Sequence, residues 1–137
     1  MNTKEWLRQC RNIEAEVKQL KESKERAYFL ALGGGIDMSK DKLSGTPKNG
    51  TEDKFAAYAD YSFLLDAKIT ELLTKRLEIR RLINELDNYK HRMLLQYYYI
   101  DCLTWEQIAE KLNNDVRWIY KLHGIALQKI DELRKSH

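Results

Sequence analysis

The chain has 137 residues, which leaves room for one small domain with an extended element but not for a multi-domain enzyme. A third of the residues are charged and proline occurs only once, a composition typical of a soluble, mostly helical protein. No window is apolar enough to cross a membrane, and the formal net charge of +3 is too small to indicate nucleic-acid binding by itself.

The first predicted element is a long helix over residues 3–32. The N-terminal residues 1–5 show neither the apolar core of a signal peptide nor an Arg- and Ser-rich transit pattern, so we expect a cytoplasmic protein. Within 3–32, apolar or small side chains recur mainly at steps of four and three, the spacing of a coiled-coil seam. A helix of this length extends about 45 Å and needs a partner helix. The seam consists of Trp6, Cys10, Ile13, Val17, Leu20, Ala27 and Ala31.

A connector follows over residues 33–50. It begins with three glycines, which destabilise a helix by about 1 kcal/mol each relative to alanine, and it continues with Ser, Lys, Asp, Gly and Asn. The glycines follow no strand and lack the Gly-Lys-Ser/Thr ending of a phosphate-binding loop. We therefore expect them to end the helix rather than to bind a nucleotide.

A second long helix is predicted from Thr51 onward, because Thr51 can cap it and two acidic residues follow. The two long helices can fold back as an antiparallel hairpin or assemble with a second copy, and the sequence leaves both open. The second stripe is wider than one partner helix covers, which favours a homodimer. This stripe consists of Tyr58, Leu65, Ile69, Leu72, Ile79, Ile83 and Leu86, flanked by Phe55, Leu73, Leu77 and Leu82.

Residues that carry catalysis or bind metals in other proteins are scattered here. Cys10 and Cys102 lie far apart, and His91, His123 and His137 form no cluster. We expect reduced cysteines, no metal site and no cofactor. Neither paired carboxylates nor a nucleophile with a neighbouring base occurs at a spacing that chemistry requires, so we do not expect an enzyme.

The C-terminal range 90–137 has the order and lengths of a helix-turn-helix. Thr104, followed three residues later by Gln107, is a capping box that starts a helix. Asn113-Asn114 forms the turn, and Asp115 caps the next helix. The expected helix-turn-helix core residues are Ile108, Ala109, Leu112, Ile119 and Leu122.

Aromatic residues in this range have both packing and binding interpretations. Successive residues cannot share one helical face, so at most one or two of the three tyrosines 97–99, in a short helix over 94–100, could stack on bases. Packing in the core is the favoured interpretation. Core packing is also favoured for Trp105. The sequence leaves core packing and exposure open for Trp118.

In a helix-turn-helix, the first turns of the second helix enter the major groove of duplex DNA. Arg117 can make a bidentate contact to a guanine edge, and Lys121 can contact a phosphate or a guanine. The range 90–137 also carries eight Lys/Arg against six Asp/Glu. A solvated charged face is the alternative interpretation. The expected DNA-contacting residues are Val116, Arg117, Trp118, Tyr120, Lys121 and His123.

The segment TWEQIAEKL, residues 104–112, resembles the first helix of the helix-turn-helix in sigma-factor region four, and 115–130 matches the length of the second. Residues 119–124, IYKLHG, are more similar to small prophage-encoded regulators, the ArpU and RinA late-gene activators of Gram-positive phages. The resemblance covers the C-terminal third of the chain. It implies that bases and phosphates are contacted by Val116, Arg117, Tyr120 and Lys121.

These features predict an all-α protein in which residues 1–89 form a long antiparallel helical hairpin or coiled coil for oligomerisation or partner binding, and residues 90–137 a DNA-binding domain. The predicted function is that of a phage or prophage transcription regulator that binds double-stranded DNA and acts as an activator with host RNA polymerase. Two alternatives remain. A ring of many copies would favour a DNA-packaging component similar to small terminase subunits. The absence of salt-dependent affinity for any duplex would favour a coiled-coil interaction protein without DNA binding.

Overall fold

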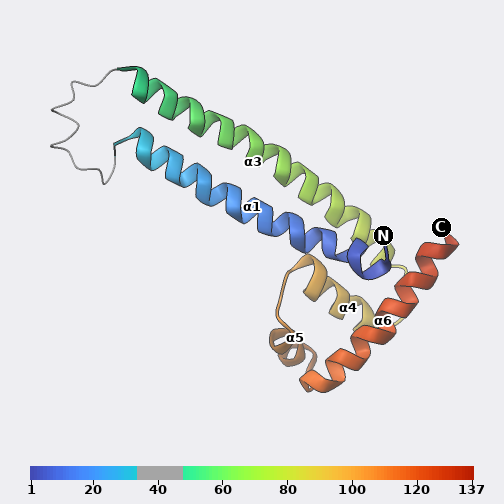
Figure 1. The fold of residues 1–137 in the computed structure, drawn as a ribbon. Coiled ribbons are helices and arrows are strands. Elements are labelled where there is room, and N and C mark those ends of the chain that lie inside the picture. The colour runs from blue at the N-terminus through green and yellow to red at the C-terminus, as the bar shows by residue number, and fades with distance from the viewer. Residues whose placement is uncertain (34–47) are drawn as a thin grey trace. The chain divides into compact units, whose positions relative to one another are not determined.

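The computed structural model describes residues 1–33 and 48–137, with the backbone alone for 48–54. Every regular element in these ranges is a helix, as labelled in Figure 1, so the prediction of an all-α fold is confirmed. None of the helices in the described ranges is long and apolar enough to span a membrane. The elements are α1 Thr3–Ala31, α3 Lys48–Ile83, α4 Tyr89–Leu95, the short π-helix η1 Gln96–Ile100, α5 Trp105–Leu112 and α6 Val116–Ser136.

Helices α1 and α3 form the predicted antiparallel hairpin. Near the middle of α1, a Glu16 carboxylate oxygen lies 3.0 Å from Nζ of Lys68 in α3. Near the end of α1, Tyr28 packs against Tyr58 with ring centroids 5.3 Å apart. The residue numbers of the partners fall along α3 as they rise along α1, so the two helices run side by side in opposite directions (Figure 1).

The sequence predicted a connector between these two helices. The connector expected over residues 33–50 falls mostly outside the described residues. Its last three residues, 48–50, are already helical, because α3 begins at Lys48 rather than at the predicted cap, Thr51.

The contacts divide the chain into two compact units. One combines Met1–Ile13 with Leu72–His137, and the other is Glu14–Glu71. This division differs from the boundary expected at residue 89, since the first turns of α1 and the last turns of α3 belong with the C-terminal helices. We call these two segments, residues 1–13 and 72–83, the hairpin base.

The unit that contains the C-terminal helices is built on one buried cluster. The hairpin base contributes Leu7, Cys10, Ile79 and Ile83, all of which are buried. Helices α4, α5 and α6 contact one another and complete the same cluster. Its remaining members are Leu86, Leu94, Leu95, Tyr98, Tyr99, Ile100, Ile108, Ala109, Ile119, Leu122, Ala126 and Ile130.

A π turn links α4 to the loop before α5. The amide of Asp101 donates to the carbonyl oxygen of Gln96, five residues back, at 2.9 Å. A turn with one extra residue separates successive side chains by a smaller angle than an α-helix does. Tyr98 and Tyr99 therefore both reach the core, and Tyr97 is half-buried against it. The prediction that these tyrosines pack in the core is confirmed.

Truncation of Ile83 tests how strongly the fold depends on the hairpin base. Ile83 is 0% exposed, whereas Thr74 on the same helix is exposed. We expect Ile83→Ala to lower the free energy of unfolding by about 2–5 kcal/mol, because it leaves a cavity. The control Thr74→Ala should change it by about 0.5 kcal/mol or less. Urea unfolding followed by circular dichroism measures both, and equal effects would contradict this description of the core.

Candidate nucleic-acid interface

A capping box starts α5. The backbone of Thr104 is extended, with φ −78° and ψ 162°. Its Oγ1 accepts a hydrogen bond from the amide of Gln107 at 3.2 Å, and Oε1 of Gln107 accepts one from the amide of Thr104 at 2.9 Å. Two amides that the first helical turn leaves without partners are thereby satisfied. The capping box predicted from the sequence is confirmed.

A short turn over residues 113–115 separates α5 from α6. Asn113 adopts the left-handed conformation, with φ 59° and ψ 41°, and the amide of Asn114 donates to the carbonyl oxygen of Ala109 at 3.0 Å. Asp115 then caps α6, because its Oδ1 accepts from the amide of Trp118 at 2.8 Å. This predicted cap is also confirmed. Together these bonds fix the direction in which α6 leaves the turn.

The helix-turn-helix core expected from the sequence lies on the inner faces of α5 and α6. Ile108, Ala109, Ile119 and Leu122 are buried, and Leu112 is half-buried against the same cluster. Because this side of α6 is covered, the opposite side of its first turns is left to solvent.

The exposed side of α6 carries two cations and two aromatic side chains. Arg117 and Lys121 are exposed, and Trp118 and Tyr120 are 44% and 51% exposed. Val116, by contrast, is half-buried and packs against the core. No Asp or Glu occurs from residue 116 to residue 130, so this stretch of helix offers the two cations no acidic neighbour of its own.

His123 does not belong to this exposed face, contrary to the expectation that it contacts DNA. It follows Ile119 by four residues and therefore points to the same buried side of α6. Its Nε2 lies 2.7 Å from the hydroxyl oxygen of Tyr99. Burial, with a smaller contribution from the positive charges of Lys4 and Arg8, lowers the pKa of His123 to about 4, so the ring is neutral near pH 7.

Aromatic stacking joins α5 to the π turn and to the exposed face. The ring of Trp105 stacks on Tyr98 at 3.9 Å between centroids with 12° between the planes, and it meets Tyr120 edge to face at 5.6 Å. Trp105 thus packs against the core, as predicted. Trp118, for which the sequence left both possibilities open, is exposed.

The contribution of α1 to this unit was not predicted from the sequence. The guanidinium of Arg11 donates to the carbonyl oxygens of Tyr98 at 2.6 Å and Leu103 at 3.4 Å, so α1 ties down the π turn. One signal was available, since Lys4, Arg8 and Arg11 recur at steps of four and three and so share one side of α1. Nothing in the sequence indicated which element that side meets.

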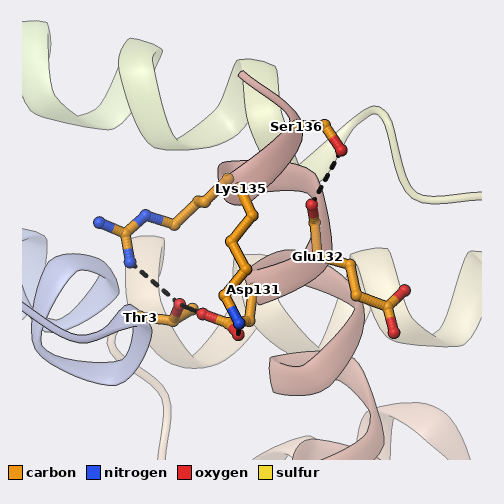
Figure 2. A network of polar contacts seen from close by, with 6 residues as sticks. Thr3, Asp131, Glu132, Lys135 and Ser136 are labelled. Carbon is orange, nitrogen blue, oxygen red and sulfur yellow. Dashed lines mark hydrogen bonds and ion pairs between the residues drawn. The ribbon is translucent and has the colours of Figure 1, made fainter.

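A polar network joins the start of α1 to the end of α6, as Figure 2 shows. The hydroxyl of Thr3 donates to a carboxylate oxygen of Asp131, and the guanidinium of Arg134 donates to the oxygen of the same hydroxyl at 3.0 Å. The second carboxylate oxygen of Asp131 lies 3.1 Å from Nζ of Lys135. The Arg134 guanidinium also lies over the ring of Trp6, 4.9 Å from its centroid. The first turn of α1 is therefore fixed against α6.

Residues 34–131 match the model of a family described as proteins of unknown function, DUF1492. The match covers more than half of the chain, so the chain belongs to this family. No curated protein and no solved structure matches the chain.

Replacement of His123 tests its buried, neutral state. Folding lowers the pKa of His123 from 6.5 to about 4, so the neutral ring is favoured in the folded state. Its contribution to stability is complete above pH 6.5 and is lost as the pH falls from 6.5 to about 4, by up to about 3 kcal/mol. We expect His123→Gln to flatten the unfolding free energy over this pH range. An unchanged slope in His123→Gln would refute the assignment.

Proposed function

We propose that this member of the DUF1492 family is a sequence-specific DNA-binding transcription regulator that recognises double-stranded DNA with the first turns of α6. The observation that carries the proposal is the division of α6 into two sides. Ile119, Leu122 and His123 are buried, whereas Arg117 and Lys121 are exposed on a stretch of helix without acids. A helix capped at its start, preceded by a tight turn and exposed on one side is the arrangement with which helix-turn-helix proteins enter the major groove.

The side chains on the exposed face suit both kinds of DNA contact. Arg117 has a planar fork of donors that matches the O6 and N7 acceptors of guanine. Lys121, one turn later, is suited to a phosphate oxygen or to guanine. Tyr120 is held edge to face by Trp105 and presents a hydroxyl close to the same face, while Trp118 offers apolar surface. In this proposal Arg117 carries sequence discrimination and Lys121 carries affinity.

The proposal includes an activating role with RNA polymerase in a phage or prophage, which rests on the resemblance of residues 104–130 to sigma-factor region four and to the ArpU and RinA activators. It also includes a homodimer. Large apolar side chains on α3 remain exposed, which supports association with a second copy: Phe63, Leu64, Leu73 and Leu77. A symmetric dimer would bind half-sites about one helical turn apart.

Selection from a pool of random duplexes tests DNA recognition by α6. We expect the wild-type protein to enrich one defined site at moderate salt and Arg117→Ala/Lys121→Ala to lose that enrichment. The reason is that each bidentate base contact contributes about 1–3 kcal/mol of discrimination. The matched control is Lys18→Ala/Lys21→Ala, which removes two exposed cations from α1 and should enrich the same site as the wild type.

Two further outcomes would count against the proposal. If the wild type bound no duplex even at low salt, the helix-turn-helix would be a packing module and DNA would not be its ligand. If both double variants lost affinity equally and no site were enriched, binding would be a nonspecific effect of charge. The mass of the complex with the enriched site distinguishes a dimer, expected for the regulator, from a ring of many copies, expected for a packaging component.

A further inference from the structure

Two exposed cations at the start of α1 lie beside α6, outside the face already described. Lys4 and Arg8 are one helical turn apart and both are exposed. Neither forms an ion pair among the residues that the structure describes. Arg11, the next cation on this side of α1, is instead directed inward to the carbonyl oxygen of Tyr98. The first turns of α1 therefore carry two cationic side chains that form no hydrogen bond or ion pair with the part of the chain that the structure describes, so their charges are available to a partner.

The position of these cations relative to α6 is fixed by bonds on both sides of Lys4. Thr3, immediately before it, is bonded to Asp131 and Arg134 of α6 (Figure 2), and the ring of Trp6, two residues after it, lies under Arg134. The charges of Lys4 and Arg8 are also close enough to His123 to help lower its pKa. Both cations thus lie on the part of α1 that is bonded to the end of α6, within electrostatic range of His123, two residues after Lys121.

The acids near Lys4 and Arg8 do not cancel the charge of these two cations. Asp131 is bonded to Thr3 and paired with Lys135 at 3.1 Å. Glu5 is the only acid among the first thirteen residues, and residues 116–130 contain none. The exposed surface that carries Arg8 and Lys121 is therefore suited to an anionic partner.

Gly124 provides a second, independent observation on the same surface. It follows Arg117 by seven residues and Lys121 by three, so it shares their side of α6, and it is exposed. A glycine inside a helix lowers its stability relative to alanine. A Cβ at this position would meet no atom within 4 Å, so packing within the protein gives no reason for a glycine here. Close approach of another molecule would supply one.

We infer that the DNA-contacting surface extends from the first turns of α6 across Gly124 to α1, where Lys4 and Arg8 bind phosphates of the same duplex. This inference rests on the proposed function and adds residues from the other end of the chain. Backbone contacts of this kind fix the register of the protein on the duplex and raise affinity, but they carry no base specificity. Substitution of the cations on α1 should therefore have a different effect on DNA binding from substitution of the cations on α6.

The salt dependence of binding tests the role of Lys4 and Arg8. The logarithm of the binding constant falls with the logarithm of salt concentration, with a slope of about 0.9 per neutralised phosphate. With the duplex enriched by the wild-type protein, we expect Lys4→Gln/Arg8→Gln to weaken binding and to reduce the magnitude of this slope by about 2. The site that this variant enriches should stay the same. The matched control Lys18→Gln/Lys21→Gln, which removes two exposed cations further along α1, should leave the slope unchanged.

Gly124→Ala tests the close approach with two opposing readouts. We expect its thermal unfolding midpoint to rise, because alanine is the better helix former at an exposed position. We expect its affinity for the enriched duplex to fall severalfold, because the added methyl group meets the DNA backbone. A loss of affinity without a loss of stability cannot be attributed to misfolding.

The outcomes separate this inference from the proposed function. If the wild type enriches a site but Lys4→Gln/Arg8→Gln keeps the full salt slope, α1 does not contact the duplex and the inference is overturned, while recognition by α6 stands. Unchanged affinity in Gly124→Ala would likewise overturn the close approach. If the wild type binds no duplex, both proposals fail together.

Discussion

The C-terminal helices α4 to α6 do not close their own core, and the rest of the structure depends on that constraint. Helices α4 and α5 are short, and on their own they leave one side of the buried cluster open. Leu7, Cys10, Ile79 and Ile83 of the hairpin base cover that side. Since burial of apolar surface is the main favourable term in folding, the orientation of α6 is coupled to the two segments of the hairpin base. The turns that are proposed to touch DNA are therefore packed against residues from the start of α1 and the end of α3.

Polar contacts then fix details of the helix arrangement that apolar packing alone does not determine. The π turn brings two successive tyrosines into the core, and each finds a polar partner there. The ring of Tyr98 lies under the Arg11 guanidinium at 4.1 Å, and the hydroxyl of Tyr99 meets Nε2 of His123. Buried polar groups without partners are costly, so these bonds specify one arrangement of the helices. Burial in this core raises the pKa of Tyr99 and lowers that of His123.

What the sequence could predict follows from the range of each interaction. The helices, the hairpin, the capping box of Thr104 and the cap at Asp115 depend on residues within a few positions or on a repeating pattern, and these predictions were confirmed. The burial of His123 depends on Tyr99, 24 residues earlier in the chain, and the position of α1 depends on Thr3 and Asp131, 128 residues apart. A periodic pattern shows that a side is apolar or basic, but it does not show which element that side meets. For the same reason, the sequence favoured core packing for Trp105 but left both interpretations open for Trp118. The structure places Trp105 against Tyr98 and leaves Trp118 exposed.

The local distribution of the charges is a stronger indication of an anionic partner than the net charge is. A net charge of +3 on 137 residues is common among proteins with no anionic partner. On the hairpin, however, acids sit among the bases, as where Lys68 meets Glu16 and Glu71 and where Lys75 meets Glu78. Residues 116–130 contain no acid, and the carboxylate of Asp115 just before them caps α6. Arg117 and Lys121 stay exposed there, with Lys4 and Arg8 on the neighbouring part of α1. Screening in physiological salt limits such fields to roughly 8 Å, so a partner responds to this local cluster and not to the total. The duplex proposed as the partner carries a phosphate charge about every 1.7 Å along its axis, a charge density that suits such a local cluster of cations.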